Sequence, residues 1–143
     1  MTTALVAQAP GIALPRPTRV SGPFWEGCAR GELMFQRCDQ CRAPLFDPMV
    51  RCRWCCSDRL SWERSAGRGE VYSWSVVWRP PTPAFVTPYA VVIVALDEGY
   101  HMLSNLIGCE VADVEVGLRV GVTFHEAGDG MVLPYFTPLE ARP

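Results

Sequence analysis

The chain has 143 residues, 49% of them hydrophobic, and a formal net charge of −2. This length can bury one sizeable core, or two small cores when a metal clamps the smaller one. The longest apolar run, Ala90–Leu96, is far too short to cross a bilayer, and the acidic balance does not favour general binding to nucleic acid phosphates. We therefore expect a soluble, cytoplasmic protein that is neither membrane-bound nor a general nucleic-acid binder.

The first two segments in chain order are an arm and a small metal-held module. Residues 1–22 carry prolines and no positively charged start, which predicts a flexible N-terminal arm instead of a signal peptide. Pro23 suits a first helical turn, so a short helix is expected over 23–33. Residues 34–62 alternate short extended pieces with two cysteine turns. We therefore assign 23–64 to a helix and a ribbon that holds a metal.

Residues 65–138 predict a mostly β domain, followed by a tail at 139–143. Five stretches are rich in β-branched or aromatic residues and are bounded by Gly, Pro or Asp: 70–79, 89–96, 101–107, 119–126 and 131–136. Tight turns are expected at 97–99 and 127–130, a Pro-rich loop at 80–88, and a helical turn within 109–117. A five-stranded antiparallel barrel with one such helical crossing is the OB architecture.

The ribbon contains two Cys-x-x-Cys motifs separated by ten residues. Seven is an odd number of cysteines, so they cannot all pair in disulfides, whereas four thiolates on two facing turns suit a tetrahedral ion. We predict one structural Zn²⁺ bound by Cys38, Cys41, Cys52 and Cys55. A rubredoxin-like iron site uses the same geometry and stays open as the alternative.

Several arginines surround these motifs. Four thiolates leave a Zn²⁺ site with excess negative charge, and five arginines lie within a few residues of them: Arg37, Arg42, Arg51, Arg53 and Arg59. These guanidinium groups either offset that charge or receive the phosphates of a ligand. The sequence leaves both roles open.

No complete active site emerges from the residues, so no catalytic residue is assigned. The chain has two histidines, His101 and His125, and strand alternation explains each of them without a nucleophile and base pair. Motifs for a nucleophile elbow or a phosphate-binding loop are absent from the sequence. The chain is therefore not expected to be an enzyme by itself.

Large aromatic side chains gather in the first part of the chain. Alternation along 70–79 places Tyr72, Trp74, Val76 and Trp78 on one face. The favoured interpretation is that this face fills the barrel core and its junction with the ribbon. The alternative is an exposed surface for a partner, because aromatics and Arg concentrate in interfaces. The candidate residues for a partner or ligand surface are Phe24, Trp25, Arg37, Arg53, Trp78, Arg79 and Phe85.

Over residues 23–138 the sequence resembles the zinc-ribbon and OB-fold proteins of domain of unknown function 35. The resemblance is carried by FWEG at 24–27, GEL at 31–33, QRC with the two cysteine pairs at 36–55, L-x-W at 60–62, SAGRGEVYSW at 65–74, PPTPAF at 80–85, PY at 88–89 and LPYF at 133–136. It implies a helix and a rubredoxin-like ribbon ahead of an OB barrel. Arg42 and Cys56 stand where this family usually has Gly after each cysteine pair, so a positive φ is expected at both.

The resemblance also implies a companion role. Such proteins are similar to small subunits that associate with thiolase-superfamily enzymes, among them acetyl-CoA acetyltransferase-like thiolases, lipid-transfer-protein-like aldolases of steroid side-chain breakdown, and acyltransferases. The partner would carry the catalytic residues, with acyl-CoA at or near the shared interface of a hetero-oligomer. Two alternatives stay open: a free-standing acyl-CoA carrier, and an OB module for single-stranded nucleic acid.

Overall fold

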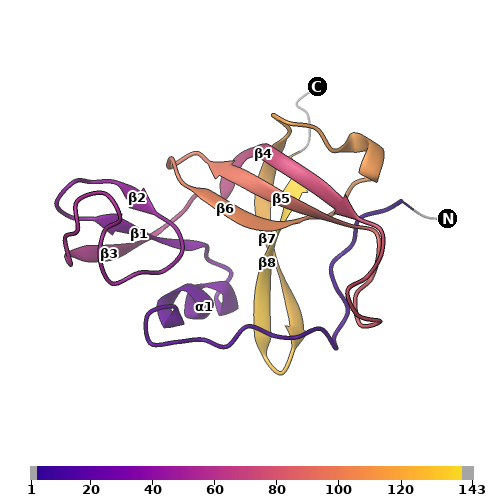
Figure 1. The fold of residues 1–143 in the computed structure, drawn as a ribbon, viewed down its shortest axis with the longest axis horizontal. Helices are drawn as coiled ribbons and strands as arrows, with labels where there is room; N and C mark the ends of the chain where they lie inside the picture. Colours follow the sequence, from indigo (N-terminus) through magenta and orange to yellow (C-terminus); the bar gives the residue numbers. More distant parts are fainter. Residues whose placement is uncertain (1–2, 140–143) are drawn as a thin grey trace.

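The computed structural model describes residues 3–139 and divides into a small sheet and a closed barrel (Figure 1). The small sheet has the strand order β2-β1-β3, and the barrel has the order β4-β5-β6-β8-β7. The elements are α1 (Gly22–Ala29), β1 (Met34–Cys38), β2 (Pro44–Leu45), β3 (Leu60–Arg64), β4 (Arg68–Val77), β5 (Tyr89–Leu96), β6 (His101–Leu106), the 3-10 turn η1 (Val111–Asp113), β7 (Arg119–Gly128) and β8 (Met131–Pro138). The predicted fold class, a short helix and a ribbon ahead of a five-stranded barrel, is confirmed.

The helix α1 is shorter than the sequence predicts. Pro23 occupies its first turn, but the helix ends at Ala29, and Gly31 adopts a φ of 77°, the left-handed backbone that follows many helix ends. A Cβ on Gly27 would lie 2.5 Å from Cγ of Met34. Glycine at that position therefore allows α1 to lie directly against β1. Within residues 3–139, no helix has the length and apolar character that a bilayer crossing needs.

The barrel strands follow the predicted stretches closely. In β5 every second residue is buried, and the residues between them are half-buried. β5 pairs antiparallel with β4 and β6, β7 pairs antiparallel with β8, and β6 meets β8 in parallel at one register position. The turn η1 lies between β6 and β7, where a helical turn is predicted. This connectivity is that of an OB barrel.

The aromatic face that was expected to fill the barrel core is exposed, so that interpretation is wrong. Tyr72, Trp74 and Trp78 keep 58%, 40% and 52% of their surface exposed, whereas Val71 is fully buried. A β-bulge between Val71 and Ser73 interrupts the strict alternation on which the sequence argument depends. It separates Tyr72 from Trp74, which pairs with the buried Val92 of β5 yet stays partly exposed. In addition, β4 ends before Trp78, which lies in the following loop.

A stack of three aromatic rings joins the ribbon to the barrel. Tyr100, at the turn between β5 and β6, stacks on Phe35 of β1 with ring centroids 4.9 Å apart. Phe46, which follows β2, stacks on Tyr100 at 5.6 Å. Because both neighbours of Tyr100 belong to the ribbon, its ring fixes the ribbon against one end of the barrel.

Part of the segment that the sequence predicts to be a flexible arm contacts the barrel. Leu5 is 2% exposed and joins the core, and its C=O accepts a hydrogen bond from the N–H of Gly108 at 2.9 Å. One buried leucine in a Pro-interrupted segment has no strand periodicity, so the sequence pattern does not indicate this contact. Residues 1–2 and, from the expected tail, residues 140–143 lie outside the described part of the chain.

Candidate metal centre and adjoining groove

Strand β1 and the two cysteine turns bring the four cysteines together. Their Sγ atoms all lie within 4.8 Å of one another. The Sγ to Sγ distance is 3.5 Å between Cys38 and Cys55, and 3.6 Å between Cys41 and Cys52. Four sulfurs at about 2.3 Å from a tetrahedral Zn²⁺ stand about 3.8 Å apart. The cluster therefore has the size and ligand chemistry that one such ion needs.

The two cysteine turns share one backbone geometry. Arg42 and Cys56 have the positive φ that the sequence predicts, 66° and 63°. Each follows the second cysteine of a pair, and each donates its N–H to the C=O of the first cysteine, Cys38 or Cys52, at 2.9 Å. A non-glycine residue in this region is strained, and such strain persists where the surroundings hold the backbone fixed. Coordination of all four cysteines by one ion would do so.

Backbone N–H groups point at two of the sulfurs. The N–H of Cys41 donates to Sγ of Cys38 at 3.5 Å, and this bond is the main cause that lowers the pKa of Cys38 to about 6. Burial acts to raise the pKa of Cys52, but the N–H groups of Cys55 and Trp54 and the side chains of Cys41 and Cys55 together outweigh it, so the net shift is downward. A lowered pKa favours the thiolate, which is the form that binds a metal.

The arginines near the cysteines are partly engaged within the ribbon. Arg37 donates from Nε to Oε2 of Glu63 at 3.0 Å, which ties β1 to β3. Arg53 donates from Nη2 to the C=O of Phe46 at 2.7 Å and also borders a hollow of about 340 Å³. These contacts favour a structural role for Arg37, while Arg53 keeps access to the solvent side of the ribbon.

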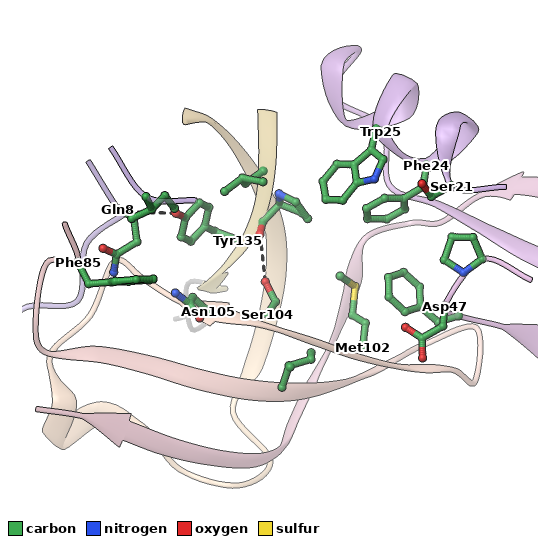
Figure 2. A pocket seen from close by; sticks show the side chains of 16 residues that line it. Gln8, Ser21, Phe24, Trp25, Asp47, Phe85, Met102, Ser104, Asn105 and Tyr135 are labelled. Carbon is green, nitrogen blue, oxygen red and sulfur yellow. Dashed lines mark hydrogen bonds between the residues drawn. The ribbon is translucent and has the colours of Figure 1, made fainter. Parts of the chain in front are cut away.

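A second hollow, which we call the groove, opens beside the ribbon (Figure 2). Its volume is about 380 Å³, and its walls come from α1, the N-terminal arm, the segment 46–48, the Pro-rich loop, β6 and β8. The side chains that define most of its apolar surface are Phe24, Trp25, Phe46, Phe85, Met102, Leu133 and Tyr135. Such an apolar concavity with a few polar groups is the usual form of a ligand site.

Buried and partly buried hydrogen bonds fix the walls of the groove. The Gln8 side chain donates from Nε2 to the C=O of Val86 at 3.0 Å and accepts the Val86 N–H at 2.8 Å. The Gln8 N–H donates to the hydroxyl of Tyr135 at 3.1 Å. On the opposite strands, Ser104 Oγ donates to the C=O of Pro134 at 3.1 Å (Figure 2). The arm, the Pro-rich loop and β8 are therefore held together around the groove.

Three of the candidate surface residues meet at the groove. Phe24, Trp25 and Phe85 come from α1 and the Pro-rich loop, and all three line it. Phe24 is 5% exposed and packs edge-on against Phe46, so it forms part of the wall. Trp25 and Phe85 are half-buried. Of the three, Trp25 and Phe85 thus remain accessible to a partner.

The other candidate residues lie elsewhere. Arg37 and Arg53 belong to the ribbon, and Trp78 and Arg79 are exposed just after β4. Sequence reasoning missed Gln8, because an isolated glutamine in a Pro-interrupted arm carries no signal. It also gave no role to Leu133–Tyr135, although the LPYF motif had been noted and could have marked β8 as a wall of the site.

Both histidines are accounted for by ring packing. His101 is exposed on β6 and lies against Tyr72 with ring centroids 4.6 Å apart. His125 on β7 packs edge-on against Tyr135 at 5.4 Å. Neither ring needs a catalytic role to explain its position.

Comparison with known proteins places these features in one family. Residues 62–125 match a domain described as the C-terminal OB-fold domain of ChsH2. A DUF35 domain-containing scaffold protein of Methanothermobacter thermautotrophicus is 31% identical over 112 residues, which cover 74% of this chain and 84% of that protein. The chain belongs to the DUF35 family.

Two other relatives extend the comparison. A solved structure described as the Ltp2-ChsH2(DUF35) aldolase matches this DUF35 chain with a TM-score of 0.80 and 34% identity, covering 87% of this chain and 98% of that one. A probable enoyl-CoA hydratase alpha subunit of Thermomonospora curvata is 36% identical over 133 residues. That match covers 92% of the DUF35 chain but 42% of the relative, so the chain spans about two fifths of the hydratase subunit's length.

Proposed function

We propose that the chain is a non-catalytic subunit of a thiolase-superfamily complex that acts on acyl-CoA, and that a lipid-transfer-protein-like or thiolase-like partner carries the catalytic residues. The observation that carries this proposal is the aldolase relative, whose description pairs a DUF35 component with Ltp2. The hydratase relative, described as acting on an enoyl-CoA, supports a coenzyme A thioester as the class of substrate. Acyl-CoA then lies at or near the interface between the two subunits.

Exposed aromatic side chains support a surface for such a partner. Trp54, Tyr72 and Trp78 are 71%, 58% and 52% exposed. Exposed rings of this size are enriched where proteins meet. Trp25 and Phe85 at the edge of the groove are the candidate anchors on the helix and the Pro-rich loop.

Within this subunit we propose one structural Zn²⁺ bound by the four clustered cysteines. The separate core of the ribbon has only three buried residues among 3–139, Cys38, Leu45 and Cys52, and two of these are the proposed ligands. Because so little apolar surface is buried there, the ion supplies stability that packing does not. The proposed division of the chain is a helix and ribbon unit at 23–64 and a barrel unit at 65–138.

Coexpression of the tagged chain with the thiolase-superfamily subunit encoded nearest to it tests the proposed function. We expect the two chains to copurify in a fixed ratio and to turn over acyl-CoA only together, with each chain alone as the control. Acyl-CoA binding by a chain that copurifies with no partner would favour the free-standing carrier. Tight binding of a single-stranded oligonucleotide would favour the nucleic-acid module. Turnover by the isolated chain would refute the non-catalytic role.

A further inference from the structure

The lining of the groove is apolar and almost uncharged. Among its described residues, Asp47 carries the one charged side chain, and neither arginine nor histidine takes part. Phosphate groups in proteins are held by cations such as arginine, so this lining does not suit the nucleotide end of a coenzyme A thioester. It suits a hydrocarbon group, for which aromatic and aliphatic walls provide the contact.

We propose that the groove binds the uncharged acyl end of a thioester and leaves the charged nucleotide end outside. The choice of a thioester rests on the proposed function, whereas the choice of the acyl end rests on the lining. Phe24, Phe46 and Met102 supply the apolar wall next to the ribbon.

The lining also contains a polar group that can meet the carbonyl of the ligand. Asn105 lies between Phe85 and Ser104 in the close view of the groove (Figure 2). Within residues 3–139 the Asn105 side chain makes no hydrogen bond to the protein. Its amide N–H groups can therefore donate to a carbonyl oxygen of the ligand, which fixes the orientation of an otherwise apolar group.

Contacts within the chain fix the shape of the groove. Phe46 stacks on Tyr100 at 5.6 Å and meets the edge of Phe24 at 5.4 Å, which fixes one wall. The two hydrogen bonds between Gln8 and Val86 fix the opposite side. A preformed pocket binds with a smaller cost in ordering than a wall that must close around the ligand.

The first experiment follows the methyl group of Met102 by ¹³C NMR in the isolated full-length chain. The probes are octanoyl-pantetheine, octanoyl-CoA and free CoA, and Met102→Leu assigns the signal. We expect both octanoyl probes to shift the Met102 signal and free CoA to leave it unchanged. Free CoA that shifts the signal as strongly as octanoyl-CoA, or octanoyl-pantetheine that shifts nothing, would overturn the proposal.

A matched pair of surface variants tests the location. Leu103 lines the edge of the groove, whereas Val116 lies in the loop after η1, and the two are 66% and 67% exposed. Leu103→Trp adds bulk at the groove, and we expect it to weaken octanoyl-pantetheine binding at least tenfold. Val116→Trp adds the same ring elsewhere and should leave binding unchanged. Equal affinities in the two variants would place the ligand outside the groove.

A further variant, Asp47→Asn, tests the charge argument. Asp47 has a φ of 63°, and asparagine tolerates this backbone, so Asp47→Asn removes the carboxylate with little strain. We expect the affinity for octanoate to rise about threefold in Asp47→Asn, while the affinity for neutral methyl octanoate stays the same. A parallel change for both probes would show that the carboxylate does not select against anions.

The outcomes separate this inference from the proposed function. If the chain copurifies with its catalytic partner but no octanoyl probe reaches the Met102 methyl group, the acyl site is refuted and the subunit role stands. If octanoyl-pantetheine binds in the groove and no partner is found, the acyl site stands and the subunit role fails. If Leu103→Trp abolishes partner association while no acyl probe binds, the groove receives a side chain of the partner, which refutes the acyl site.

Discussion

Gln8 offers a sharp test of how the groove is held, because its side chain makes both hydrogen bonds to the backbone of Val86. Gln8→Ala removes both, and each is worth about 1 kcal/mol net. Val86 is 36% exposed, so water can reach its freed N–H and C=O groups, and the larger penalty for buried unpaired groups does not add. We expect the free energy of unfolding to fall by about 2 kcal/mol, which is roughly 30-fold in the equilibrium constant.

Urea unfolding followed by tryptophan fluorescence measures this loss, and hydrogen exchange at the Val86 amide reports on the loop itself. Gln8→Met is the control for packing, since it keeps most of the side-chain volume but neither hydrogen bond. It should therefore lose nearly as much stability as Gln8→Ala. If Gln8→Met is as stable as the parent chain, packing and not hydrogen bonding holds the Pro-rich loop, and the reasoning fails.

Three further predictions concern the metal, the partner and pH. Cys38→Ser should unfold the ribbon, and the parent chain should hold one equivalent of zinc by metal analysis; well-folded protein with less than about half an equivalent would contradict this. Trp25→Ala should leave thermal unfolding and zinc content near the parent values but weaken association with the catalytic partner by about 2 kcal/mol, with Val116→Ala as the control. If Trp25→Ala binds the partner as tightly as the parent chain does, Trp25 is not an anchor for the partner. The Arg119 guanidinium donates a hydrogen bond to Asp97 at 2.9 Å and lowers the pKa of that carboxyl group. The ion pair therefore stabilises the fold at pH values above the unfolded carboxyl pKa of about 3.9. This stabilisation is lost as the pH falls below that value. Both side chains are 48% exposed, so Asp97→Asn should lower the free energy of unfolding by less than about 1 kcal/mol at pH 7. The stabilities of Asp97→Asn and the parent chain should converge near pH 2. A difference that persists at pH 2 would show that the ion pair is not its cause.

The barrel could be predicted because its signal is local. Strands such as β5 alternate strictly, and turns such as 97–99 contain the residues that their backbone needs. The bulge beside Tyr72 was not predictable in this way, since one extra residue in a strand leaves the composition unchanged and reverses the faces that follow. The burial of Leu5 could not be predicted for a related reason. It depends on contact with the barrel and not on the neighbours of Leu5 in sequence.

The cysteine cluster and the groove also differ in how far the sequence alone predicts them. The cysteine cluster is encoded by two short motifs, and even the positive φ of Arg42 and Cys56 could be expected from their positions. The groove instead gathers residues from segments far apart in the chain. Phe24 and Phe85 could be named from their motifs, but only the fold shows that Gln8 and Tyr135 stand beside them.

Phe46 connects the metal centre to the groove. Its ring lines the groove and stacks on Tyr100, while its C=O accepts the hydrogen bond from Arg53, which lies between Cys52 and Cys55. The second cysteine turn therefore positions a wall of the groove through one hydrogen bond from a charged group, worth roughly 1.5 kcal/mol or more. An ion that shapes the ribbon would thus also shape the groove without touching its ligand.

This connection makes a final prediction. Arg53→Met keeps the apolar stem but no donor, so we expect it to retain one equivalent of metal while binding octanoyl-pantetheine about tenfold more weakly, the change that about 1.4 kcal/mol produces. Chelation of the metal should weaken binding at least as much, because it frees the whole turn that carries Arg53. Metal analysis and the Met102 methyl signal are measured on the same samples. If Arg53→Met binds the probe like the parent chain while the metal-free chain does not, the metal acts through general folding of the ribbon, and the Arg53 to Phe46 hydrogen bond is not the link.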